Sequence, residues 1–494
     1  MKANRTDAGS GPVGTQSYDD LLYKYTGFAS GDTVSRISRS KERPPRFVSQ
    51  EEAADDVRFL FDMFKYGYCM YQAFGGDQVF GRARESVLAG LPLIARADGS
   101  VRVKALRDLV LENIGYIQDG HASFANAKLY RRSNWFHSER FGFQKDESGW
   151  YTTTHFSRWL GLIPRYRDGD RQYLVSVDGL PPEESLALSL GESGELVYNF
   201  SLLRKEFTRR IRVKAVFRDA SGLAEQEIVL RRHTSEIAPD IDIEFRPKAA
   251  AYRTMTRNGI PVVVHQSSIP SSASAETLLA SFIANAAALR GNPAVVLDVR
   301  HHEGGQLEYP LRWTQAFMGT EFSQDERYAT LETRTSFRLY RFFAESYYAG
   351  NPARLAESKR FFAEKIAWLD ANESPESAWA FRGQADTQPG LLPNRTPLFV
   401  LMDSRTGSAG EGFMYLLRQF ENVVFVGENT KGLMVSASPA WGSLPHSRLP
   451  FVLTVDISLK DAREGLEGIG YKPDIWVDPG RALERVLRYV DSRS

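Results

Sequence analysis

The sequence has very little cysteine and no long apolar run. Cys69 is the only cysteine among 494 residues, so an intrachain disulfide scaffold is excluded. No apolar run approaches the roughly eighteen residues of a membrane-spanning helix, so we expect no membrane span. The polar stretch 1–14 lacks the apolar core of a signal peptide. As written, the sequence indicates a cytoplasmic protein, whereas a mature form of a longer precursor would be periplasmic or secreted.

An excess of charge of one sign is also missing. The 62 Lys and Arg residues balance 61 Asp and Glu residues, which gives a formal net charge of +1. No bulk field therefore attracts nucleic acid or anionic lipid, and substrate selection has to be local. His301 and His302 are adjacent, but neighbouring side chains at a strand end point to opposite faces, and no second ligand cluster has metal spacing. We expect no metal and no cofactor.

The chain is too long for one ordinary hydrophobic core, so we expect two to four domains around an α/β core. Ser49 and Glu52 form a capping box that opens the first helical pattern. Apolar periodicity then predicts a disordered tail and linker over 1–47, an N-terminal helical domain over 48–124, a small β-rich module over 125–240, an α/β core over 250–480 with a helical insertion over 310–390, and a C-terminal helix over 481–494. The insertion interrupts the α/β pattern, and we expect it to lie over a site as a lid.

A serine framed by glycines lies between an apolar strand pattern and a helix pattern. This stretch is Thr406-Gly407-Ser408-Ala409-Gly410-Glu411. A serine at a strand-to-helix elbow projects its hydroxyl outward, and the free N–H groups of the helix start can hold an oxyanion. The alternative interpretation is a glycine-rich turn in which Ser408 caps the helix.

Three further motifs in the same order change the balance between these interpretations. Asp298 to Gly305 is a buried strand that ends in a glycine pair, Glu428 follows the elbow helix, and Gly470 to Val477 closes the series. Together with the elbow they resemble the tail-specific, or C-terminal-processing, serine protease family. The resemblance implies a crotonase-like (ClpP/crotonase) αβ core and a PDZ-like middle module.

The branches of this family differ in the general base. The lysine that the bacterial tail-specific branch uses falls at Leu433, so that base is absent, and Lys431 is two residues away and stays a weaker candidate. The elbow is more similar to the tricorn-like and retinoid-binding-protein-like branches. Resemblance to the tricorn-like branch implies His121 as the base, because an imidazole can take the serine proton near neutral pH. A histidine that only bonds the backbone at a helix end is the alternative.

The support behind His121 is incomplete in the sequence. The resemblance implies that Glu467 orients the histidine, but Gly120 occupies the place of the serine that links the two in the tricorn-like pattern. Glu467 would then act directly, through water, or not at all. Asp119 and Glu428 are alternative orienting groups, and each could equally be a solvated loop charge or a cap.

The resemblance also supplies the oxyanion hole and the overall function. The expected donors are the backbone N–H of Ala409 and that of Gly304 or Gly305, where glycine permits a close approach of the substrate carbonyl. We expect a serine peptidase that acts through an acyl-enzyme on peptide or unfolded-protein substrates, which the PDZ-like module adds as a strand. The alternatives are a binding protein with an inactive protease fold and an acyl esterase.

Overall fold

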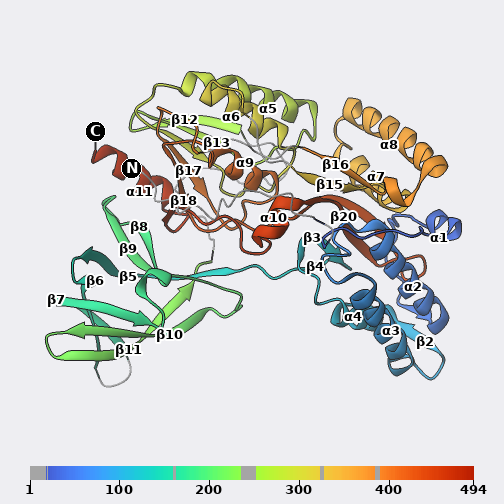
Figure 1. The fold of residues 1–494 in the computed structure, drawn as a ribbon, viewed down its shortest axis with the longest axis horizontal. Coiled ribbons are helices and arrows are strands. Elements are labelled where there is room, and N and C mark those ends of the chain that lie inside the picture. Colours follow the sequence, from blue (N-terminus) through green and yellow to red (C-terminus); the bar gives the residue numbers. More distant parts are fainter. Residues whose placement is uncertain are drawn as a thin grey trace.

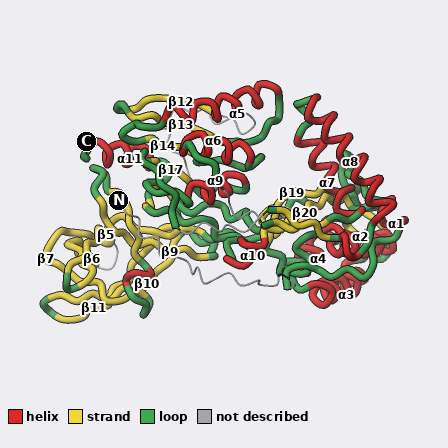
Figure 2. Tube along the Cα trace, turned by 45° about the horizontal axis from the view of Figure 1, so that its top comes forward, coloured by secondary structure: helices red, strands yellow, loops and turns green. Residues whose placement is uncertain are grey.

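The protein is a mixed α/β chain with an N-terminal helical region, a middle module of strands and a core sheet covered by helices (Figures 1 and 2). The computed structural model describes residue 18 and residues 20–159, 163–234, 252–322, 327–383 and 390–493. Of the predicted tail and linker over 1–47, residues 1–17 and residue 19 lie outside the described residues. Within them, no helix combines the length and the apolarity that a membrane crossing requires.

The N-terminal region is helical and starts earlier than its pattern indicated. Residues 20–47 are not a loose linker, because Leu22, Tyr25 and Val34 are buried against the first hydrophobic core or in the adjoining helix. The predicted capping box is confirmed, since Ser49 N–H donates to Glu52 Oε2 and Glu52 N–H to Ser49 Oγ. The elements are α1 (Gly31–Ser35), β1 (Phe47–Ser49), α2 (Gln50–Gly67), α3 (Gly76–Ile94), β2 (Ser100–Arg102) and α4 (Val103–Asn113).

The middle module is a sheet of seven strands that closes on itself, at the lower left of Figure 1. Strand β11 pairs with β10 and also with β5, which joins five of the strands into a ring. Its described residues contain no α-helix. The elements are β5 (Asn134–Asp146), β6 (Gly149–Trp159), β7 (Ile163–Val177), β8 (Leu186–Leu190), β9 (Leu196–Arg204), β10 (Arg210–Asp219) and β11 (Gly222–Arg232).

The core sheet has the strand order β12-β13-β14-β17-β18-β21, and all its pairs are parallel except β12 with β13. Helices α5, α6 and α9 cover one face through Phe282, Trp313 and Phe413, and α11 covers the other. The C-terminal helix therefore belongs to the core. The bounds are β12 (Tyr252–Arg257), β13 (Ile260–His265), α5 (Ala273–Asn285), β14 (Val295–Asp298), α6 (Glu308–Met318), β17 (Leu398–Met402), α9 (Ala409–Leu417), β18 (Val423–Gly427), β21 (Ile475–Trp476) and α11 (Ala482–Asp491).

A second sheet, whose strand pairs are all antiparallel, joins N-terminal and C-terminal parts of the chain beside the core. Its strands run in the order β16-β15-β20-β3-β4, with β19 paired to β20. The insertion contributes β15 and β16 to this sheet, and α7 packs on β19. The bounds are β3 (Asp119–Phe124), β4 (Ala127–Leu129), β15 (Tyr328–Leu331), α7 (Arg334–Tyr347), α8 (Pro352–Asn372), β16 (Trp379–Arg382), β19 (Ser436–Ser443), β20 (Pro450–Ser458) and α10 (Leu459–Glu464). This sheet brings residues of the N-terminal region to the C-terminal half of the chain.

Candidate active site

Ser408 occupies a strained elbow between β17 and α9. Its φ of 54° and ψ of −123° lie in a region that costs a residue with a side chain about 1–3 kcal/mol. The N–H groups of Glu411 and Gly412 donate to the Ser408 carbonyl oxygen at 2.8 and 3.0 Å, which places Ser408 at the N-cap position of α9. Ser408 is the N-cap residue of α9, but an ordinary N-cap has extended φ and ψ, so the conformation of this cap is unusual.

Hydrogen bonds from both neighbouring loops hold the elbow in this conformation. Gly407 N–H donates to the carbonyl oxygen of His302 at 2.9 Å, and Lys431 N–H donates to that of Thr406 at 2.8 Å. Ser408 N–H donates to Oε2 of Glu411 at 3.1 Å. Strain of this kind persists only where the surroundings over-determine it, and here backbone groups on both sides do so.

The carboxylate of Glu411 ties the elbow to the loop that follows β18. It is fully buried and accepts from Thr430 Oγ1 at 2.5 Å, from Gly432 N–H at 2.6 Å and from Leu433 N–H at 2.8 Å. Burial raises its pKa, while these donors lower it. The sequence marked Glu411 as part of the elbow motif but gave no sign of this connection.

The glycine turn after β14 lies directly against the Ser408 elbow. Gly304 and Gly305 have φ values of 112° and 126°, which side chains rarely adopt, and a Cβ on Gly304 would come within 2.8 Å of Ser408 Cβ. The N–H of Gly304 is already committed to Nδ1 of His302 at 3.2 Å. Gly305 and Ala409 both line the cavity that Ser408 lines. Of the two predicted glycine donors, Gly305 is thus the better placed.

His121 lies in a bulge of β3. The pairing of β3 with β4 shifts register between Asp119 and Ser123, and bulges of this kind redirect a side chain out of the ladder. The buried carboxylate of Asp119 organises the bulge by accepting from His121 N–H at 2.8 Å and from Ala122 N–H at 3.2 Å. Asp119 therefore holds the backbone under the histidine, and it also accepts the hydroxyl proton of Tyr68 at 2.8 Å.

Ser408 and His121 line the same cavity, whose volume is about 1000 Å³. Burial lowers the pKa of His121 to about 4, with further lowering from the charges of Lys128 and Lys431 and an opposing effect of Asp119. The imidazole is therefore neutral at pH 7 and able to accept a proton. Its Nδ1 is buried and has no hydrogen-bond partner among the described residues.

Glu467 lies beside this histidine, but its oxygens are occupied by backbone donors. Oε1 accepts from Gly120 N–H at 2.8 Å, and Oε2 accepts from the N–H groups of Met434 at 3.2 Å and Val435 at 3.0 Å. Burial, with the nearby charge of Asp119, raises its pKa to about 8. None of these bonds goes to the imidazole, so direct orientation of His121 by Glu467 is absent from this conformation.

Leu433 fills the space of the missing serine. A Cβ on Gly120 would lie 1.9 Å from Leu433 Cδ2 and 3.2 Å from Glu467 Oε1. The two departures from the family pattern, glycine at position 120 and leucine at position 433, are therefore sterically complementary. Together they remove the link between Glu467 and the histidine.

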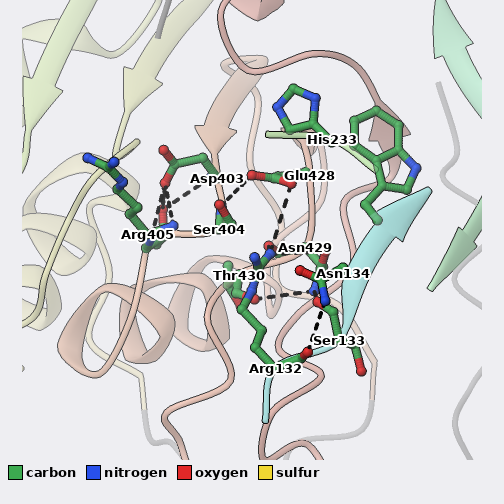
Figure 3. Close-up of polar contacts among 12 residues, drawn as sticks. Arg132, Ser133, Asn134, His233, Asp403, Ser404, Arg405, Glu428, Asn429 and Thr430 are labelled. Atoms are coloured by element: carbon green, nitrogen blue, oxygen red, sulfur yellow. Dashed lines mark hydrogen bonds and ion pairs between the residues drawn. The ribbon is translucent and has the colours of Figure 1, made fainter. Parts of the chain in front are cut away.

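The remaining candidates separate in space. Lys431 lines the cavity, and its Cδ would be 3.1 Å from a Cβ on Gly407, so it packs on the elbow. Glu428 is turned away, toward Ser404 N–H at 3.0 Å and the guanidinium of Arg132 at 3.9 Å (Figure 3). It does not line the cavity.

The sequence gave no signal for one other residue of the cavity. Lys128 on β4 is an exposed residue, but its ammonium reaches the carbonyl oxygen of Gly120 at 3.4 Å, and desolvation together with the charge of Lys431 lowers its pKa. A single lysine on a short strand belongs to no motif. The opposite wall carries aromatic rings from α7 and β19, namely Tyr340, Phe343, Tyr347, Tyr348 and Trp441. No group of three or more His, Cys, Asp and Glu side chains suited to a metal ion occurs in the described ranges.

Sequence comparison assigns the core to a known family. Residues 263–477, which span the glycine turn, the elbow and the closing motif, match the model of peptidase family S41. Over these residues the chain is similar to peptidase family S41. It is accordingly a serine-type peptidase, a hydrolase, and the predicted family resemblance is confirmed. None of the curated proteins matches the sequence.

Solved structures of S41-type proteases are among those similar to the chain. Mature CPAF is 14% identical, with a TM-score of 0.39 over 90% of this chain and 95% of that chain. The photosystem II D1 C-terminal processing protease is 14% identical, with a TM-score of 0.35 over 89% and 96%. The tricorn protease is 11% identical, with a TM-score of 0.35 over 90% of this chain and 36% of that chain.

Proposed function

We propose that this S41 peptidase cleaves peptide bonds through an acyl-enzyme on Ser408, with His121 as general base. Ser408 Oγ attacks the scissile carbonyl carbon, and its proton passes to the imidazole of His121 and then to the leaving amine. Water, deprotonated by the same imidazole, then attacks the acyl-enzyme and restores Ser408. The observation that carries the proposal is the strained elbow of Ser408 opening into the cavity that His121 also lines.

The developing oxyanion is held by the N–H groups of Ala409 and Gly305. Ala409 is the first residue of α9, where a helix N–H has no partner within the helix. Gly305 lines the cavity on the other side of the elbow, whereas the N–H of Gly304 is occupied. The loss of one such donor in serine proteases costs about 10²–10³ in kcat.

Lys431 is the competing general base. Its side chain packs on the elbow and lines the cavity, and no salt bridge or side-chain hydrogen bond of its ammonium is found in the described part of the chain. An amine accepts a proton only after it has lost its own, whereas the neutral imidazole of His121 is ready at pH 7. The histidine is therefore preferred.

Peptide or unfolded-protein segments are the proposed substrates. The aromatic wall from α7 and β19 gives the cavity an apolar side suited to large apolar side chains, which supports a substrate-selecting role for the insertion. The crotonase-like arrangement of the core also stays part of the proposal, supported by its parallel strands and the elbow helix. The PDZ-like role of the strand module has less support, because its described residues have no α-helix beside which a peptide strand would lie.

A serine-directed fluorophosphonate probe tests the assignment. We expect labelling of the protein at Ser408, its loss in Ser408→Ala, and a strong decrease in His121→Ala. Hydrolysis of casein measured in parallel separates a peptidase from an esterase, which would cleave only small acyl esters. Absence of both labelling and hydrolysis would favour the alternative of a binding protein, to which the partnerless Nδ1 of His121 already gives some weight.

A further inference from the structure

A chain of buried polar side chains lies beneath the glycine turn and plays no part in the mechanism above. His265 at the end of β13, Ser268 and His302 are all fully buried. His265 Nε2 is 3.0 Å from Ser268 Oγ, and Ser268 Oγ is 3.1 Å from His302 Nε2. Burying polar side chains costs free energy unless they are hydrogen-bonded, so three buried polar side chains bonded in series indicate a structural or functional role.

A backbone N–H group at one end sets the direction of the hydrogen bonds between these three side chains. Because Gly304 N–H can only donate, Nδ1 of His302 accepts, and the neutral ring carries its proton on Nε2. His302 then donates to Ser268 Oγ, and the single hydroxyl proton of Ser268 goes to His265 Nε2. Burial lowers the pKa of His302 to about 4 and that of His265 well below its ordinary value, so both rings are neutral at pH 7.

Ser268 also holds the glycine turn with its main chain. Its N–H donates to the carbonyl oxygen of Gly304 at 3.0 Å, and its carbonyl oxygen accepts from Gln306 N–H at 2.9 Å. A Cβ on Gly305 would come within 2.3 Å of the carbonyl carbon of Ser268, so the two backbones are in close contact. The orientation of the Gly305 peptide is thus set from the side of Ser268.

His302 connects the same turn to the elbow. Its carbonyl oxygen accepts from Gly407 N–H at 2.9 Å, and a Cβ on Gly410 would lie 2.8 Å from its Nδ1. The imidazole therefore contacts the helix that begins after Ser408 while it holds Gly304. The ring of His265 is fixed in turn by stacking on Phe282, with centroids 3.9 Å apart and planes at 4°.

We infer that Ser268 and His302 are positioning residues that hold the Gly304–Gly305 turn so that Gly305 N–H and Ala409 N–H converge on one oxyanion. His302 accepts the N–H of Gly304, which therefore does not bind the oxyanion, and it fixes the position of the turn relative to the elbow. Ser268 keeps His302 in the tautomer with the proton on Nε2. The inference rests on the proposed role of Ser408. It separates the residues that shape the oxyanion hole from those that line it.

Steady-state kinetics on a peptide substrate test this inference. We expect Ser268→Ala and His302→Ala to lower kcat about tenfold to a hundredfold, as a misplaced catalytic group does, with KM within about twofold. Ser268→Thr keeps the hydroxyl, and His302→Asn keeps an acceptor for Gly304 N–H, so each should recover most of the loss. Thr314→Val, which removes a buried hydroxyl bonded to Pro310 in α6, is the matched control and should leave kcat unchanged.

Hydrogen exchange of the segment 299–306 tests the same inference without any turnover. Exchange should be slow in the wild-type chain and in Thr314→Val, and faster in Ser268→Ala and His302→Ala, with unchanged exchange in the strands of the middle module. Equal exchange in all variants, or a loss of kcat that the threonine and asparagine variants do not recover in folded protein, would overturn it. Absence of activity in the wild-type protein would reject the proposed function. The exchange result would still decide whether Ser268 and His302 hold the glycine turn.

Discussion

The two sides of the cavity differ in how many hydrogen bonds hold their candidate catalytic residues. On the nucleophile side, Ser408, Glu411 and the glycine turn are held by backbone and buried side-chain bonds on every flank. On the histidine side, the backbone of His121 is well held by Asp119, but its Nδ1 has no partner in the described chain. The difference shows that backbone strain at Ser408 needs many supporting contacts, while the neutral state of the His121 imidazole is kept by burial and by the charges of Lys128 and Lys431.

Removal of the nucleophile should have the largest effect. Ser408→Ala is expected to lower kcat by about 10⁴ or more and to abolish fluorophosphonate labelling, because the covalent step is lost. Ser438→Ala is the matched control, since Ser438 also lines the cavity at positive φ and its hydroxyl bonds Asp456. Intact labelling in Ser408→Ala would place the nucleophile elsewhere.

Removal of the base should come next and identifies it. His121→Ala is expected to lower kcat about 10²–10⁴-fold, the usual contribution of general base catalysis, whereas Lys431→Met should cost less than about tenfold. Circular dichroism checks that both variants fold. The reverse order of effects would identify Lys431 as the general base, so that nucleophile and base would lie on the same side of the cavity.

Restoring the missing link should sharpen the contrast between the two sides. Gly120→Ser alone overpacks against Leu433 and should destabilise the fold by about 1–3 kcal/mol in chemical denaturation. The double variant Gly120→Ser/Leu433→Ala makes room for a hydroxyl near Glu467 and should recover the stability, with kcat raised up to about tenfold. A double variant as unstable as the single one would show that Leu433 is not the obstacle.

The pH dependence should show the smallest effect and tests the electrostatics of the base. Protonation of His121 stops proton transfer, and its pKa is lowered to about 4 by burial and then by Lys128 and Lys431. The acid limb of kcat/KM should therefore lie near pH 4, well below the ordinary histidine value of about 6.5. Lys128→Met removes one lowering charge, so the limb moves to higher pH and activity at pH 5 falls by about twofold to fivefold. Lys460→Met, also in the cavity, should leave the limb in place.

Local patterns allowed much of this molecule to be predicted. The capping box at Ser49, the buried strands of the core and the helix over 482–491 all follow from periodicity and caps, which act within a few residues. The closure of the middle module and the folding of residues 20–47 onto the helices depend on partners far along the chain. No local pattern reports such contacts.

The site divides in the same way. The order of the motifs led to Ser408, the glycine pair and His121 as candidates, and the structure brings the nucleophile, Gly305 and the histidine to one cavity. Other features depend on individual interatomic distances in the folded protein. These are the contact of Lys128 with Gly120, the hydrogen bond of Gly304 N–H and the backbone bonds to Glu467. Spacing along a sequence does not contain that information.

The short contact between β3 and β20 has a consequence for how activity is lost. Only two residue pairs form that ladder, Phe124 with Phe451 and Ser123 with Val452, and the histidine lies just beyond them. Parts of a protein open in separate cooperative units, and a short ladder opens at a lower free energy than a central parallel sheet. Heating should therefore abolish activity by separating His121 from Ser408, while the core that carries the serine is still folded.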